Sequence, residues 1–105
     1  MTMFADRERA FEAKFAHDAE LKFRVEARRN KLLGLWAADV LGKTGPEASA
    51  FAAAIVRTDL LSGGQADVVA HLVEQLSGSA AEADIRDKLN ECTSRARREV
   101  LDDLQ

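Results

Sequence analysis

The chain has 105 residues, of which 47% are hydrophobic and 31% are charged, and its formal net charge is −3. This length fits a single domain, and the composition is that of a globular protein, which excludes an intrinsically disordered chain. A lone cysteine, Cys92, excludes an internal disulfide bond and suits a reducing cytoplasm, while the acidic balance argues against nucleic acid as a partner.

The first 18 residues, MTMFADRERAFEAKFAHD, contain no glycine or proline and can therefore form a helix. At ~100° per residue, Phe4, Phe11 and Phe15 fall within about 60° of one another and form a narrow aromatic ridge. One interpretation is that this ridge packs on the protein's own core. We favour another, in which the ridge enters a groove of a partner, because the later helices already suffice for a core. Such a segment would be mobile when free, because an isolated helix of this length is marginal in water.

A first bundle helix is predicted at about 19–41. Its apolar positions, which recur mostly at steps of three and four residues, are Phe23, Ala27, Leu33, Trp36, Ala37, Val40 and Leu41. Gly34 costs about 1 kcal/mol relative to alanine inside a helix, and Gly42 is a natural terminator. The longest apolar stretch, Leu32 to Leu41, is too short for insertion into a membrane.

Two shorter helices follow. Pro46 suits the first turn of a helix at about 46–61, whose buried stripe is Ala48, Phe51, Ala52, Ile55 and Val56. A helix at about 65–77 is expected to bury Val69, Leu72, Val73 and Leu76.

The last helix is predicted at about 80–103, behind a capping box formed by Ser79 and Glu82. Its apolar stripe is Ile85, Leu89, Cys92, Ala96 and Val100. The chain is therefore predicted to be all-α, a four-helix bundle with a long first helix and a mobile N-terminal segment. The corresponding domain organisation is a flexible segment at 1–18 followed by the bundle at 19–105.

The stretch 19–43 is basic within an acidic chain, with six basic and three acidic residues. Lys22, Arg24, Arg28 and Arg29 suit contact with phosphate, a nucleotide or an acidic protein face. The alternative is a solvated helix face with internal pairs such as Glu20–Arg24.

Catalytic and metal-binding motifs are not found in the sequence. His17 and His71 lack further ligands at metal-site spacing, so no metal site is expected. Cys92 lies on the apolar stripe and is interpreted as a buried structural thiol. No motif pairs a nucleophile with a base, so an enzyme is not expected.

Two runs of about a dozen residues are distinctive, DRERAFEAKFAHD at 6–18 and ARRNKLLGLWAA at 27–38. Both resemble the ζ subunit family of alphaproteobacterial F1Fo-ATP synthases. The resemblance covers essentially the whole chain. It implies a cytoplasmic ATPase inhibitor that reaches the inner membrane only through F1.

The resemblance further implies that the N-terminal segment becomes helical when it wedges into a catalytic α/β interface of F1 and reaches toward γ. This would block rotation in the direction of hydrolysis, in the manner of the mitochondrial ATPase inhibitor protein. The partner-binding residues would be Phe4, Asp6, Arg7, Glu8, Arg9, Phe11, Glu12, Lys14 and Phe15. No cofactor is expected, although the resemblance leaves weak nucleotide binding open, and we expect a monomer when the protein is free. The alternative function is a small helical adaptor or a nucleotide-sensing regulator.

Overall fold

The structure, a computed structural model, describes the backbone of residues 2–62 and 64–104 and the side chains of residues 17–59 and 64–104. Four helices account for most of the described chain: α1 (Thr2–Val40), α2 (Gly45–Ser62), α3 (Gln65–Gln75) and α4 (Glu82–Asp103). The all-α prediction is confirmed. The first helix continues upstream of residue 19 and begins at Thr2.

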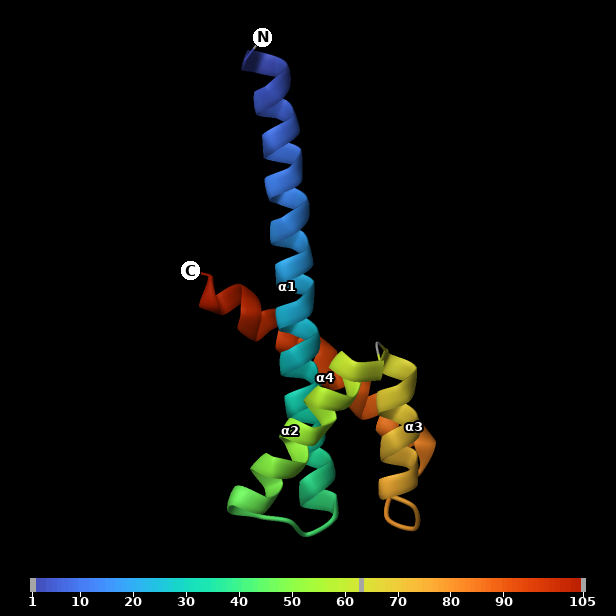
Figure 1. Cartoon of the computed structure of the whole chain (residues 1–105). Helices are drawn as coiled ribbons and strands as arrows, with labels where there is room; N and C mark the ends of the chain where they lie inside the picture. Colours follow the sequence, from blue (N-terminus) through green and yellow to red (C-terminus); the bar gives the residue numbers. More distant parts are fainter. Residues whose placement is uncertain (1, 63, 105) are drawn as a thin grey trace.

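The helices form a bundle from which α1 extends (Figure 1). The chain runs down α1, up α2, down α3 and back up along α4, which crosses α1 obliquely (Figure 1). α1 packs against α2 and α4, and α3 packs against the same two helices. The molecule measures 64 × 26 × 22 Å, and its radius of gyration is 17.2 Å. A compact domain of this length would have a radius of gyration of about 13 Å, so the extension of α1 sets the overall shape.

The core lies where the four helices meet. Its largest fully buried hydrophobic side chains come from every helix and are Leu33, Ile55, Val68, Val69, Leu72, Leu76, Ile85 and Leu89. The whole predicted stripe of α4, from Ile85 to Val100, is buried. Trp36, Val40, Leu41 and Phe51 are partly buried and pack against this core. The periodicity of the apolar positions therefore identified the inward face of most helices.

α1 and α2 approach each other closely at Gly34. A Cβ atom at this position would lie 2.7 Å from the Cα of Ala52 and 3.3 Å from a side-chain carbon of Ile55. Two helix backbones come this close only where a side chain is missing. The low helix propensity of Gly34 is therefore offset by tight packing of the two helices.

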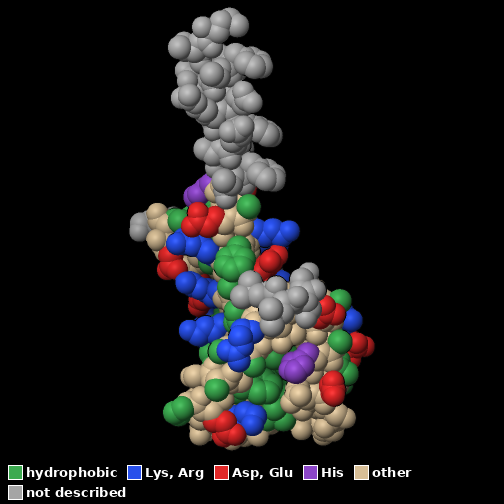
Figure 2. Space-filling view, viewed as in Figure 1, with side chains coloured by type: hydrophobic (Ala, Val, Ile, Leu, Met, Phe, Trp, Pro, Cys, Tyr) green, Lys and Arg blue, Asp and Glu red, His purple; other side chains and the backbone are tan. Residues whose placement is uncertain are grey.

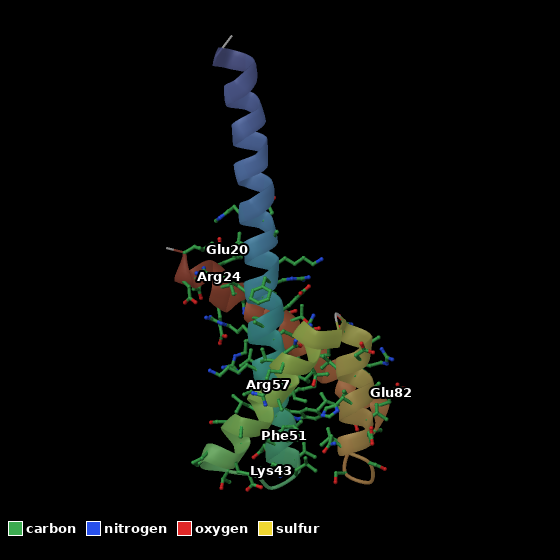
Figure 3. The ribbon with its side chains drawn as sticks, in the orientation of Figure 1. Glu20, Arg24, Lys43, Phe51, Arg57 and Glu82 are labelled. Atoms are coloured by element: carbon green, nitrogen blue, oxygen red, sulfur yellow. The ribbon has the colours of Figure 1, made fainter. Side chains whose placement is uncertain are left out.

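The turn between α1 and α2 is built on Gly42, as predicted. Gly42 has a φ of 75°, and its N–H donates to the carbonyl of Asp39 while the N–H of Lys43 donates to that of Ala38. This is a Schellman motif, in which glycine adopts a left-handed conformation and the last carbonyls of the helix are satisfied. Beside the turn, the Lys43 ammonium lies 6.0 Å from the centre of the Phe51 ring (Figure 3).

The predicted capping box of the last helix is wrong. The N–H groups of Ser79 and Ala80 both donate to the carbonyl of Leu76, so these residues complete the turn that leaves α3. Ala81 is the N-cap of α4, and its own N–H donates to the Asp84 carboxylate at 3.4 Å. Alanine has no side-chain acceptor, so only this half of a capping box can form.

Phe23 was also expected in the core, and this prediction is wrong. Its side chain is 52% exposed, although it lies on the same helix as buried Leu33. The physical reason is that the other helices do not cover this part of α1, whose first buried side chain after residue 17 is Arg29.

Candidate partner-binding site

The stretch of α1 between His17 and Arg28 has no buried side chain. Figure 1 shows α1 leaving the bundle in this region and continuing away from α2, α3 and α4. A helix normally needs a partner along its apolar face for stability. This stretch therefore presents a surface that the bundle leaves uncovered, with Phe23 as its largest exposed hydrophobic group.

The predicted partner-binding residues of the N-terminal segment all belong to the part of α1 before residue 17. These are Phe4, Asp6, Arg7, Glu8, Arg9, Phe11, Glu12, Lys14 and Phe15. Their side chains lie outside the described residues. The structure therefore gives only the helical backbone that carries these residues, which begins at Thr2.

The four residues of the basic block do not form one surface. At ~100° per residue, Arg24 and Arg28 share one side of α1, whereas Lys22 and Arg29 lie on the opposite side. Arg24 pairs with Glu20 at 3.7 Å, and both side chains are at least half exposed (Figure 3). The predicted Glu20–Arg24 pair is confirmed. Lys22 is exposed.

Arg28 and Arg29 are already engaged by acidic groups of the bundle. The Arg28 guanidinium lies 2.7 Å from the Asp103 carboxylate and 3.8 Å from that of Glu99, both on α4. These contacts hold α4 against α1 at the point where α1 leaves the bundle. Arg28 therefore has less charge to offer a phosphate than its place in the sequence suggests.

Arg29 belongs to a buried polar cluster that the sequence analysis did not foresee. Its guanidinium donates to the Asn30 carboxamide oxygen at 3.0 Å and lies 3.9 Å from the Asp59 carboxylate of α2. Asn30 is fully buried, and its amide nitrogen has no hydrogen-bond partner among the described side chains and backbone. A pocket of about 320 Å³ adjoins this cluster, with Phe23, Glu26 and Gln65 in its wall. Because Glu26 and Asp59 both face it, the pocket is poorly suited to an anion.

Cys92 is buried on α4. Burial raises the pKa of the Cys92 thiol, and the nearby cations Lys88 and Arg95 only partly offset this effect. The protonated thiol is unreactive, so these surroundings favour a structural cysteine over a nucleophile. Among the described side chains, no three His, Cys, Asp or Glu residues are placed to hold a metal ion.

Comparison with known proteins identifies the family. The family of the ATPase inhibitor subunit zeta matches residues 1–99. The chain belongs to this family. The match covers both the projecting part of α1 and the bundle, and it assigns the zeta-family chain a regulatory role as an ATPase inhibitor.

A solved structure supports the assignment. A chain whose solution structure was determined by NMR is 42% identical to this zeta-family chain, with a TM-score of 0.72. The similarity covers 79% of this chain and 98% of the solved chain. No curated protein matches the sequence. Within the described part of the chain, no helix has the length and apolar character needed to cross a membrane.

Proposed function

We propose that this chain inhibits ATP hydrolysis by F1 through insertion of the N-terminal part of α1 into a catalytic α/β interface. The observation that carries the proposal is the length of α1 outside the bundle. At about 1.5 Å per residue, the helix from Thr2 to Lys22 is roughly 30 Å long. Such a helix reaches deep into a partner while the bundle stays outside.

The inserted helix presents both kinds of group that hold protein interfaces together. Phe4, Phe11 and Phe15 are its apolar anchors, and desolvated aromatic side chains often dominate binding energy. The cations Arg7, Arg9 and Lys14 pair with acidic residues of the interface, and Asp6, Glu8 and Glu12 pair with basic ones. Reaching γ, the helix prevents the rotation that hydrolysis requires.

Full-length variants test this mechanism against F1 from the same source. Phe11→Asp combined with Phe15→Asp places two charges on the aromatic ridge, and we expect the concentration for half-inhibition to rise roughly a hundredfold or more. Ala66→Asp combined with Ala83→Asp adds the same charge at exposed positions of α3 and α4 and serves as the matched control. Unchanged inhibition by the phenylalanine variant would overturn the proposal.

A truncation provides a second test. Removal of residues 1–18 is expected to abolish inhibition, because the anchors are lost, while the core side chains between Arg29 and Val100 remain. Circular dichroism and thermal unfolding verify that the bundle is folded. A folded truncated chain that inhibits as well as the full chain would contradict the wedge.

The alternative of a nucleotide-sensing regulator is not favoured by the site. Arg28 and Arg29, which such a site would use, are occupied by Asp103, Glu99 and Asp59. Titration with Mg-nucleotide, followed through backbone amide shifts at these arginines and at Arg24, distinguishes the two functions. Tight and localised shifts would support the sensor.

A further inference from the structure

A groove runs along the junction of α1 and α2, beginning where α1 leaves the bundle. We call it the α1–α2 groove. Two adjoining hollows of about 510 and 610 Å³ form it, and both are lined by Lys31 and Val56. Its apolar lining consists of Phe23, Ala27, Leu35, Ala52, Ala53 and Val56, together with Val100 of α4. The tight contact between Gly34 and Ala52 brings the two helices together beneath this lining.

Two large apolar side chains of the groove are exposed. Phe23 is 52% exposed and Leu35 is 36% exposed, and they are two of the four large hydrophobic side chains exposed in the described part of the chain. Phe23 lies in one hollow and Leu35 in the other, so each hollow exposes one large hydrophobic side chain. Exposed apolar surface that is rimmed by polar groups is typical of a binding site.

The charges around the groove are unbalanced. Lys31 and Arg57 are exposed and line its larger hollow, and none of the described residues in the wall of that hollow is acidic. Among the described side chains, neither of them forms an ion pair, whereas Arg28 at the edge is neutralised by α4. Figure 2 shows Lys and Arg side chains gathered along this part of the molecule, and Figure 3 labels Arg24 on α1 above Arg57 on α2. The smaller hollow also has Asp103 in its wall, where this carboxylate pairs with Arg28. The groove is therefore apolar at its base, and the rim of its larger hollow is positive.

We infer that the α1–α2 groove docks an acidic amphipathic helix of the ATPase, as a second contact beside the inserted N-terminal segment. The lining from Phe23 to Leu35 extends roughly 18 Å along α1, which is about three turns of a docked helix. An apolar face would cover Phe23, Leu35 and Val56, and carboxylates on its flank would meet Lys31 and Arg57.

This inference rests on the proposed function, because it assigns the same partner to both contacts. α1 carries both contacts and is one continuous helix, so the second contact forms with little additional loss of freedom. The groove would thus raise the affinity of the chain for F1 without taking part in the block of rotation.

Charge reversal at the rim provides the first test. In the full chain, Lys31→Glu combined with Arg57→Glu is expected to weaken binding to F1 about tenfold, and to reduce the dependence of binding on salt. The matched control is Arg97→Glu combined with Arg98→Glu, since these exposed residues of α4 lie outside the groove. Equal affinities of the two variants, both folded by circular dichroism, would overturn the inference.

The ridge variants separate this inference from the proposed function. In the Phe11→Asp and Phe15→Asp background, we expect weak residual binding to F1 without inhibition, and its loss when Lys31 and Arg57 are also reversed. Residual binding that persists after the charges of Lys31 and Arg57 are reversed would refute the docking at the groove and leave the wedge unaffected. Wild-type inhibition by the ridge variant would instead refute the wedge, whatever the groove does.

A steric test and a cross-link identify the occupant. Ala53→Gln fills the groove without changing charge and is expected to weaken binding severalfold, whereas Ala50→Gln, also exposed on α2, changes a position outside it. A photoreactive residue at position 53 should cross-link to an acidic helix of the ATPase. The end of α4 in a second copy of the chain, with Leu101, Asp102 and Asp103, is also acidic and partly apolar. Cross-linking only to such a second copy would overturn the inference.

Discussion

α1 is one helix in two environments. From Arg29 to Val40 it lies in the bundle, where Leu33 and Ala37 are fully buried. From His17 to Arg28 it has no buried side chain, and Phe23 is half exposed. Residues 17–28 include six charged and five apolar residues, whereas residues 29–40 include three charged and seven apolar ones, so composition already favours burial of the second stretch. Coverage by the other helices completes the difference, since α2 has 18 residues and α4 has 22 against 39 in α1.

The largest expected effect contrasts Leu33 with Phe23. Leu33→Ala leaves a cavity in the core and should reduce the free energy of unfolding by about 2–5 kcal/mol. Phe23→Ala removes a larger side chain from an exposed position and should change it by no more than about 0.5 kcal/mol. Urea denaturation followed by circular dichroism measures both. Similar losses for the two variants would mean that the projecting part of α1 also packs on the bundle.

Gly34→Ala tests the close contact of α1 with α2. Alanine is the better helix former, yet its Cβ would meet the Cα of Ala52, so we expect a loss of about 1–3 kcal/mol in stability. Gly64→Ala meets no such obstacle and should cost only about 0.5 kcal/mol through weaker N-capping of α3. A gain in thermal stability for Gly34→Ala would show that helix propensity outweighs packing here.

The two kinds of arginine on α1 give a smaller contrast. Arg29→Ala leaves buried Asn30 and Asp59 without their cation and should reduce stability by about 1–3 kcal/mol. Arg24→Ala breaks an exposed pair with Glu20 and should change stability by about 0.5 kcal/mol or less. Chemical denaturation at low and high salt measures both effects. Comparable losses of stability in the Arg29→Ala and Arg24→Ala variants would contradict the burial of Arg29.

The smallest effect concerns Cys92. Because burial raises the pKa of this thiol in the folded state, the folded protein holds the proton more tightly than the unfolded chain. Stability should therefore fall as the pH passes the ordinary pKa of a free thiol, and the fall should end above the raised pKa. Iodoacetamide at mildly alkaline pH should also modify the folded protein more slowly than the urea-unfolded one. If the stability of a Cys92→Ala variant falls over the same pH range, other titratable groups cause the fall.

The match between prediction and structure differs between elements for physical reasons. The stripe from Ile85 to Val100 on α4 was predicted correctly because spacing along one helix depends only on local geometry. The capping box at Ser79 was wrong because the turn leaving α3 uses the backbone N–H groups of Ser79 and Ala80. Of the candidate site, the Glu20–Arg24 pair was predictable because both residues lie on one helix. The ridge at Phe4, Phe11 and Phe15 stays a prediction, and its side chains lie outside the described residues.

The sequence alone determined that the chain is helical, where most apolar faces lie, and to which family it belongs, because these depend on residue order and spacing. Tertiary structure decided which part of α1 is covered, that Arg28 and Arg29 are held by acidic groups from α4 and α2, and why a glycine stands at position 34. It also created the α1–α2 groove, in which Lys31 and Arg57 come from different helices. Such features arise between elements, and no spacing within one helix encodes them.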